Sequence, residues 1–365
     1  MIKLIKAAVK RVPQIRQLIQ ERDELKVHLA RLNRVITEER DELRAHLKRL
    51  NAELDQSASA LGIVTEERDG LKDHLHRLIW ETYNLDPLKN PNFSYFLPGQ
   101  YYSPIPSLKE VRRDEQRIFH ESRTIKGVDL NLEGQVQLLS RLKEYFGEFP
   151  FCSGKSQRLR FFLDNPNFGG ADAVFLYAMM RYLKPRKIVE IGSGYSSSLM
   201  LDINELFFNG DIQFTFIEPH PELLRATLAQ GDEKKVEIIP DRVQDISLEK
   251  FASLDDGDIL FVDSSHVSKV GSDVNALFFE ILPSLRRGVY VHIHDIFFPF
   301  EYPSEWVYEG RAWNEVYLLR AFLQYNTAFR IVLFNALIAK IHEEDLQREL
   351  PTELDRAGGI WMVKC

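Results

Sequence analysis

The sequence predicts an α/β protein with a mostly parallel sheet, helices on both faces of that sheet, and a separate helical region at the N-terminus. Two observations predict this fold class. Between residues 187 and 295, five short β-branched runs alternate with helix-like segments, which is the pattern of a parallel sheet. Residues 1–80 contain no such run and repeat one helical motif three times.

The composition bounds the class of protein. The chain has 365 residues, of which 44% are apolar and 28% charged, so it can bury a sizeable core and is not wholly disordered. Its two cysteines cannot build a disulfide framework, which favours a reducing compartment. Because no apolar run has the length of a signal peptide core or a membrane span, we expect a cytoplasmic protein.

The net charge of -7 is unevenly distributed along the chain. Residues 1–80 have a net charge of +3 and the remainder -10. An acidic body argues against nucleic acid as the main ligand, since that binding depends on neutralising phosphates. The basic residues that precede the first acidic one leave two interpretations open: a weak peripheral contact with an anionic membrane or acidic partner, or a solvated helix end.

Residues 1–80 carry the sequence pattern of a coiled coil. The repeats QERDELKVHLARL, EERDELRAHLKRL and EERDGLKDHLHRL begin at Gln20, Glu38 and Glu66, so their offsets of 18 and 28 residues keep one face aligned along a helix. Apolar residues follow the three-and-four spacing of a seam at Ile15, Leu18, Leu25, Leu29, Leu32, Ile36, Leu43 and Leu50. Such a stripe needs a partner, and we predict a homo-oligomer.

Two further regions follow. A stretch rich in proline and aromatic residues excludes a regular helix, and we expect residues 81–130 to be a linker that packs on the globular body. Residues 131–365 form the predicted catalytic domain. It begins with two helical patterns, VQLLSRLKEYF and DAVFLYAMMRYL, before the first strand.

The first strand ends in a glycine turn. The run KIVEI from Lys187 is followed by Gly192, Ser193 and Gly194 and then by a helical pattern, so the turn and the helix N-terminus suit a carboxylate or phosphate. The second strand, IQFTFI, ends at Glu218, an acid in the position that accepts hydrogen bonds from ribose hydroxyls.

Acidic residues also end two later strands. The run VEII is the third strand, DILFV precedes Asp263, and GVYVHIH precedes Asp295. Ligands of open α/β sheets bind at the carboxyl ends of the strands, where Glu218, Asp263 and Asp295 all lie. The sequence therefore predicts a ligand site at this edge.

These residues resemble the class I S-adenosylmethionine-dependent methyltransferases, in the branch of bacterial small-molecule and glycan O-methyltransferases, over about residues 130–365. Glu190, Gly192, Ser193 and Gly194 resemble the first motif, Glu218 the ribose-binding acid, and Val243 and Gln244 with Asp245 the loop beside adenine. HDIFFPFEYPSEW and WNEVYLLRAFL also resemble this branch, and RIVLFNAL and GGIWMVK its last two strands.

The resemblance implies a Rossmann-like sheet of seven strands whose last strand is antiparallel and forms a hairpin with the strand before it. It implies S-adenosylmethionine as cofactor, held by the residues above and Asp263, and a methyl transfer to a small hydroxylated acceptor, a sugar or a glycan intermediate. Two alternatives stay open. One is an NAD(P)-linked oxidoreductase, although Ser197 stands where its fingerprint has a third glycine. The other is a non-catalytic coiled-coil scaffold with a degenerate fold.

The catalytic group is predicted among the side chains at the ends of the fourth and fifth strands. His266 or His294 can serve as general base near Asp263, because imidazole titrates near neutral pH. Alternatively, Asp263, Asp295 and His294 hold a divalent cation such as Mg²⁺. His292, two residues earlier on a buried strand, is expected to be a hydrogen-bonded core residue.

Aromatic residues crowd the segment that follows the fifth strand, at Phe297, Phe298, Phe300, Tyr302, Trp306, Tyr308, Trp313 and Tyr317. With Glu301, Glu305 and Glu309 they suit a polyhydroxylated acceptor, and a lid that only seals the core is the alternative. A second set before the first strand is expected to close over the cofactor: Asn165, Phe168, Asp172 and Tyr177.

Overall fold

The computed structural model describes residues 74, 99–120, 124–156, 158–352 and 357–365. The chain divides into two compact units, Met1–Glu115 and Gln116–Cys365. Apart from His74, the predicted coiled coil and the first part of the predicted linker lie outside the described residues. In the described part of the chain, no helix has the length and apolarity needed to cross a membrane.

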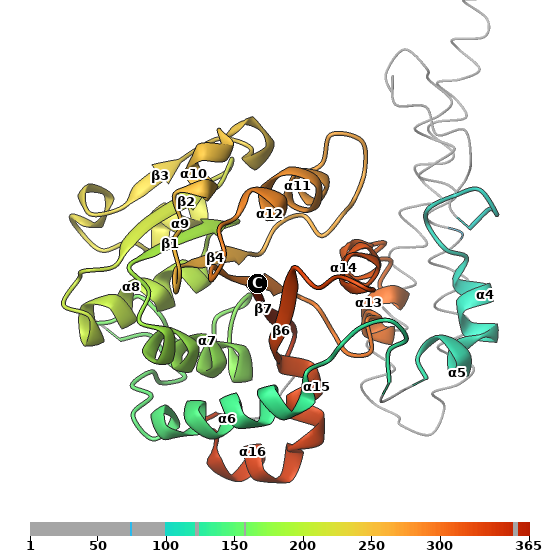
Figure 1. Cartoon of the computed structure of the whole chain (residues 1–365), viewed down its shortest axis with the longest axis horizontal. Helices are drawn as coiled ribbons and strands as arrows, with labels where there is room; N and C mark the ends of the chain where they lie inside the picture. The colour runs from blue at the N-terminus through green and yellow to red at the C-terminus, as the bar shows by residue number, and fades with distance from the viewer. Residues whose placement is uncertain (1–73, 75–98, 121–123, 157, 353–356) are drawn as a thin grey trace, which may run out of the picture. The chain divides into compact units, whose positions relative to one another are not determined.

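The unit Gln116–Cys365 is built on a sheet of seven strands in the order β3-β2-β1-β4-β5-β7-β6 (Figure 1). The strands are β1 Lys187–Ile191, β2 Gln213–Ile217, β3 Glu237–Ile239, β4 Ile259–Val262, β5 Tyr290–His294, β6 Phe329–Phe334 and β7 Gly359–Lys364. β1 to β5 pair in parallel, and β7 runs antiparallel between β5 and β6. The predicted Rossmann-like sheet with its antiparallel last strand is confirmed.

One detail of the predicted sheet is different. β6 and β7 pair with each other, but they are not a tight hairpin, because α15 Asn335–Ile341 and α16 Glu343–Glu349 lie between them in the sequence. The helix α15, NALIAKI, begins directly after the last residue of β6. The two-residue period of the strand therefore passes into the 3.6-residue period of the helix without a turn signal between them.

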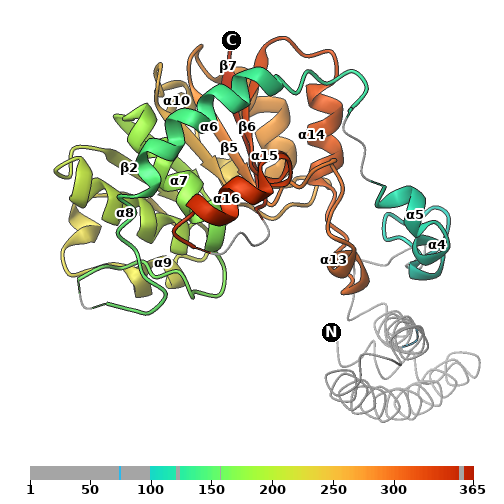
Figure 2. The same cartoon turned by 90° about the horizontal axis from the view of Figure 1, so that it is seen from below.

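Helices cover both faces of the sheet, as predicted (Figures 1 and 2). Within the described residues, the unit Met1–Glu115 contains α4 Leu108–Arg113, and α5 Glu115–Ile118 begins at its last residue. The other α-helices of the described part are α6 Leu132–Phe146, α7 Gly170–Leu183, α8 Tyr195–Phe207, α9 Glu222–Thr227, α10 Leu248–Ala252, α11 Asp273–Ala276, α12 Leu282–Ser284, α13 Ser304–Tyr308 and α14 Glu315–Leu323. A π-helical turn, Leu277–Ile281, joins α11 to α12.

Each face of the sheet has its own apolar core. α6, α7, α8 and α16 bury their apolar side chains against one face, and α10, α11, α12 and α14 bury theirs against the other. α7 is buried without interruption from Ala171 to Met180, because it packs between α6, α8 and the sheet. Ile125 and Leu130, from the predicted linker, are buried in the second core.

The segment before α7 is fixed by one buried guanidinium group. The side chain of Arg160 is 7% exposed and contacts carboxylate oxygens of Asp202 at 2.6 Å, Asp232 at 2.7 Å and Glu205 at 2.9 Å. Asp202 lies on α8 and also accepts the backbone N–H groups of Arg160 and Phe161. The acids and the guanidinium therefore hold this segment on α8.

Replacing Arg160 by Met should destabilise the fold by about 3–5 kcal/mol, because Asp202 would stay buried without a cation and Asp232 would keep only Lys235, at 4.0 Å. Urea unfolding followed by circular dichroism measures this loss. The matched control is Arg141→Met on α6, since Arg141 is 68% exposed and its contact with Glu144 is 3.4 Å. That variant should stay within about 0.5 kcal/mol of the parent protein. Equal losses of unfolding free energy in the two variants would contradict the role of Arg160 in holding this segment on α8.

Candidate functional site

The turn after β1 requires glycine. Gly192 has a φ of +79°, and a Cβ atom placed on it would lie 1.7 Å from the carbonyl oxygen of Asp263. No side chain fits at that distance, and the left-handed conformation also favours glycine. The loop after β1 therefore lies directly against the end of β4.

Glu190 lies beneath this turn. Its carboxyl group is fully buried and accepts hydrogen bonds from the hydroxyl of Ser196, at 2.5 Å, and from that of Ser197. Burial raises the pKa of Glu190 to about 8, although the two hydroxyl groups oppose that shift. The sequence predicts a cofactor contact for Glu190, whereas the structure places its carboxyl group as a support for the first turn of α8.

A cavity of about 300 Å³, which we call the first cavity, opens above the turn. Five of the residues predicted to bind cofactor line it: Gly192, Glu218, Val243, Gln244 and Asp263. The other residues that line it are Ile191, Ile217, Pro219, Arg242, Ser264, Ser265 and Asp273. Arg242 and Asp273 are not among the residues predicted to bind cofactor.

Local hydrogen bonds fix the shape of the first cavity. Glu218 accepts the backbone N–H of Ser193 at 3.3 Å and that of His220 at 2.8 Å. The side-chain amide of Gln244 donates to the carbonyl of Gly271 at 2.9 Å, which joins the loops after β3 and β4. Neither Ser193 nor Gly194 lines the cavity.

A second cavity, of about 580 Å³, lies at the ends of β4 and β5. Asp263 lines both cavities, so they adjoin at this residue. The second cavity is lined by polar and aromatic side chains: Asn165, Asn167, Phe168, Asp172, His294, Asp295, Phe297, Trp306, Arg311 and Trp313. It therefore has the mixed lining of a site for a polar small molecule.

The predicted aromatic run divides between this cavity and the core. Phe297, Trp306 and Trp313 line the cavity, whereas Phe300 and Tyr302 are buried beneath it. The two tryptophan rings make an edge-to-face contact with centroids 5.4 Å apart. The guanidinium of Arg311, which the sequence analysis does not single out, lies 4.2 Å from the centroid of Trp306.

The residues expected to close over the cofactor are placed differently. Asn165, Phe168 and Asp172 line the second cavity and not the first. Tyr177 is buried in the core, where its hydroxyl donates to the carbonyl of Glu148. Asp172 accepts hydrogen bonds from Asn335 and from the backbone of Gly358, which ties α7 to the start of β7.

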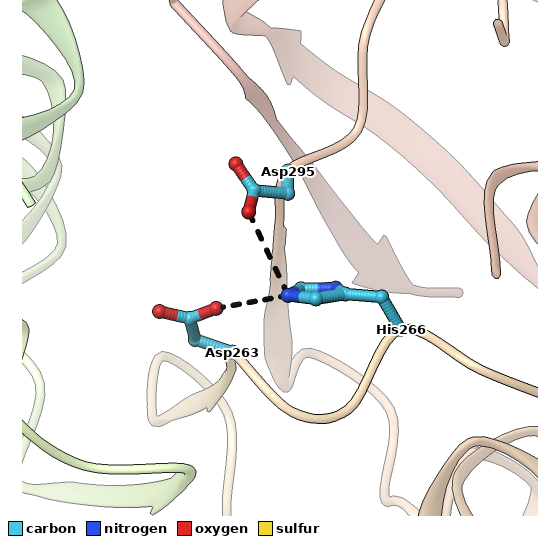
Figure 3. Close-up of side chains that lie close together, drawn as sticks. All are labelled: Asp263, His266 and Asp295. Atoms are coloured by element: carbon cyan, nitrogen blue, oxygen red, sulfur yellow. Dashed lines mark ion pairs between the residues drawn. The ribbon is translucent and has the colours of Figure 1, made fainter. Parts of the chain in front are cut away.

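His266 is enclosed by acids from three segments. Its Nδ1 is 2.9 Å from Glu315, and its Nε2 is 3.4 Å from Asp263 and 3.6 Å from Asp295 (Figure 3). Burial disfavours the charged imidazole, but Asp263 and Glu315 raise the pKa of His266 to about 10. His266 lines neither cavity, but its ring lies 4.5 Å from that of Trp313, which lines the second. Its role as general base stays a prediction.

The other two histidines lie on one face of β5. His294 lines the second cavity, and its Nδ1 has no hydrogen-bond partner among the described residues. Burial disfavours its charged form, yet Asp295 and Asp263 raise its pKa. His292 is a core residue, with its ring 4.4 Å from Phe261, but neither of its nitrogens has the expected hydrogen bond within the described structure.

The structure groups a different histidine with the two acids of the predicted metal-ligand set. The sequence predicts Asp263, Asp295 and His294, whereas the structure brings single ligand atoms of Asp263, Asp295 and His266 within 4.8 Å of one another. The Nε2 of His294 lies 3.7 Å from the Oδ1 of Asp295, which is not the oxygen that faces His266. Glu315, which no sequence motif marks, completes this cluster behind His266.

The raised pKa of Glu190 predicts a pH dependence of stability. The fold favours the protonated carboxyl group, so its contribution is complete below a pH of about 4.5 and is lost as the pH rises to 8. Between pH 6 and pH 8 the unfolding free energy should fall by about 2 kcal/mol more in the parent protein than in Glu190→Gln, at roughly 1.4 kcal/mol per pH unit. Urea titrations at both pH values measure the difference. In the surface variant Glu144→Gln, the unfolding free energy should change with pH as in the parent protein. The same pH dependence in Glu190→Gln would refute the raised pKa of Glu190.

The comparisons with known proteins agree with this geometry. Residues 189–296 match the family model described as a methyltransferase domain. An uncharacterized protein of Archaeoglobus fulgidus is 36% identical over 167 residues, which are 44% of this chain and 74% of that protein.

Two solved structures are similar at low sequence identity. A Podospora anserina methyltransferase bound to S-adenosylhomocysteine is 12% identical, covers 73% of this chain and 99% of its own, and has a TM-score of 0.36. An O-methyltransferase of tomaymycin synthesis from Streptomyces achromogenes, in complex with S-adenosylmethionine, is 17% identical, covers 71% and 96%, and has a TM-score of 0.36. The chain belongs to the same family as the archaeal protein, and its residues 189–296 are similar to the methyltransferase-domain family.

Proposed function

We propose that this chain is an S-adenosylmethionine-dependent O-methyltransferase that acts on a sugar, a glycan intermediate or another small hydroxylated metabolite. The observation that carries the proposal is that Asp263 lines both cavities. A methyl donor in the first cavity and an acceptor in the second would meet at this residue, which is the proximity that a displacement at carbon requires. The methyltransferase-domain match supports this reading.

The first cavity suits the donor. In the proposal, Glu218 accepts hydrogen bonds from the ribose hydroxyls, and Val243 and Gln244 flank the adenine. Gly192 lets the backbone approach the ligand closely, and the N-terminal end of α8 lies after the same turn for the methionine carboxylate. The bound donor supplies an electrophilic methyl group on sulfur.

The second cavity suits a hydroxylated acceptor. Trp306 and Trp313 offer apolar ring faces, while Asn165 and Asn167 offer hydrogen bonds. Burial opposes ionisation of Asp263, but His294 and His266 lower the pKa of Asp263, so the group is a carboxylate at neutral pH. Asp263 accepts the hydrogen bond of the acceptor hydroxyl, and the free Nδ1 of His294 is the second contact in that cavity.

Two other functions lead to different expectations. An NAD(P)-linked oxidoreductase shares the ribose-binding acid, but the antiparallel β7 between β5 and β6 favours a methyltransferase. A scaffold with a decayed site has no need for Gly192 and Glu218, which keep the geometry of a ligand site.

Calorimetry with S-adenosylhomocysteine tests the function. The full-length protein should bind it at micromolar concentration, and Glu218→Ala should bind it at least tenfold more weakly, since a hydrogen bond to a charged group contributes about 1.5–3 kcal/mol. Glu222→Ala, in the exposed first turn of α9, is the matched control and should bind as the parent does. Binding of NAD(P) with no binding of S-adenosylhomocysteine would sink the proposal in favour of the oxidoreductase. Absence of binding by either would favour the scaffold.

Self-association and location remain proposals from the sequence. A coiled coil over residues 1–80 would make the protein a homo-oligomer in the cytoplasm, with no nucleic-acid partner and with the basic N-terminus free for a weak membrane contact. Light scattering of the full-length chain at micromolar concentration should give a multiple of 42.5 kDa. A monomeric mass would defeat the coiled-coil proposal without affecting the enzymatic one.

A further inference from the structure

Charged side chains are unevenly distributed around the second cavity. Among the described residues that line it, Arg311 is the one lysine or arginine. Asp263 and Asp295 line it from the ends of β4 and β5, whereas Arg311 follows α13. The cavity therefore has two acids at the strand ends and a guanidinium group on the loop after α13.

The end of α13 fixes the backbone of Arg311. Gly310 has a φ of +91°, a left-handed conformation that glycine adopts without steric cost. Its N–H donates to the carbonyl of Val307 at 3.0 Å, and the N–H of Arg311 donates to the carbonyl of Trp306 at 3.1 Å. This pair of hydrogen bonds is the Schellman motif of helix ends, in which the chain turns back over the last helical turn. The side chain of Arg311 therefore returns to the ring of Trp306.

Two aromatic rings hold the guanidinium group in place. Its central carbon lies 4.2 Å from the ring centroid of Trp306 and 5.3 Å from that of Trp313. Both distances are within the roughly 6 Å at which a cation is attracted to an aromatic face. Because an aromatic face is at most a weak hydrogen-bond acceptor, these contacts position the cation and leave its N–H groups available.

The N–H donors of Arg311 are only partly used within the protein. A guanidinium group has five of them. Among the described residues, the one ion pair of Arg311 is with Glu309, at 3.1 Å, and the two side chains are 39% and 52% exposed. Water screens such a pair, so it can be exchanged for a ligand. The preferred ligand of a guanidinium group is a carboxylate or a phosphate, which can accept two parallel hydrogen bonds from it.

We propose that the acceptor in the second cavity carries an anionic group, a carboxylate or a phosphate, and that Arg311 binds this group. The inference rests on the proposed function, because it names the class of acceptor for the same site: a polyhydroxylated oxyanion such as a uronate sugar or a sugar phosphate. With the anion at Arg311, the hydroxyl groups of the acceptor are directed to Asp263. The reverse orientation would bring the anion to Asp263 and Asp295, where like charges repel, so the cavity selects one orientation.

Four related sugars test the class of acceptor: glucuronate, glucose 6-phosphate, glucose and glucosamine. Each is titrated into the full-length protein saturated with S-adenosylhomocysteine, and ligand-observed NMR gives the dissociation constant. At least one of the two anions should bind at least tenfold more tightly than glucose, which cannot form charge-assisted hydrogen bonds with a guanidinium group. The anion that binds more tightly identifies the oxyanion as carboxylate or phosphate.

Three results would overturn the inference: neither anion binds at millimolar concentration, glucose binds as tightly as both anions, or glucosamine binds most tightly. The last result would show that the acids of the cavity select a cation.

Variants of Arg311 test the residue itself. Arg311→Ala should weaken binding of the preferred anion at least tenfold and remove its preference over glucose. Arg311→Lys should recover part of the loss, because lysine keeps the charge but lacks the planar pair of donors. The matched control is Arg286→Ala, since Arg286 forms an ion pair with Asp255 at 2.5 Å and lines neither cavity. A preference for the anion that persists in Arg311→Ala would refute the role of Arg311.

Binding of S-adenosylhomocysteine separates this inference from the proposed function. Its contacts lie in the first cavity, so a variant that still binds it is folded. A parent protein that does not bind S-adenosylhomocysteine contradicts the proposed function. A parent protein that binds it and shows no preference for an anionic sugar contradicts the inference about Arg311 alone.

Discussion

The hydrogen bond between the ends of β1 and β4 fixes the geometry on which the site depends. The N–H of Asp263 donates to the carbonyl of Ile191 at 2.9 Å, which continues the parallel pairing of the two strands by one residue. This contact brings the carbonyl of Asp263 against Gly192, where a Cβ atom cannot fit. The glycine turn and the residue that follows the neighbouring strand thus adjoin, and Asp263 lines both cavities.

A second set of contacts keeps the far wall of the site in place. Asp172 on α7 accepts hydrogen bonds from the side-chain amide of Asn335 and from the backbone N–H of Gly358. These bonds join the helix before β1 to the residues next to β6 and β7. Gln135 on α6 accepts the backbone N–H of Phe334 at the end of β6. These contacts therefore join α6 and α7 to the segments that border β6 and β7.

Much of this arrangement could be predicted from the sequence. The sheet is identified by strand runs of the right length and by a glycine turn after the first of them. The positions of Glu218 and Asp263 directly after two strands predict that both lie at the ligand-binding edge of the sheet. The sequence could not show which histidine lies beside Asp263 and Asp295. Strand periodicity places His292 and His294 on one face of β5, but His266 lies in a loop whose direction is set by α14.

Glu315 and Arg311 could not be found from the sequence for a related reason. Glu315 is 49 residues from His266, and only the docking of α14 on the loop after β4 brings the two side chains together. Arg311 follows a short helix, α13, and its role depends on where the rings of Trp306 and Trp313 lie. Local patterns carry no information about such contacts.

The two acids nearest the glycine turn differ in charge, and that difference fits the proposed donor. Burial raises the pKa of Glu190 to about 8, so at neutral pH it is mostly uncharged beneath the N-terminal end of α8. An uncharged Glu190 does not neutralise the partial positive charge of that helix end, which remains for the anionic carboxylate of the methionine. Asp263 is partly buried, which opposes its charge, but His294 and His266 lower its pKa. Its negative charge then lies where the positive sulfonium and the acceptor hydroxyl would meet, so the environment of each acid supports a different role.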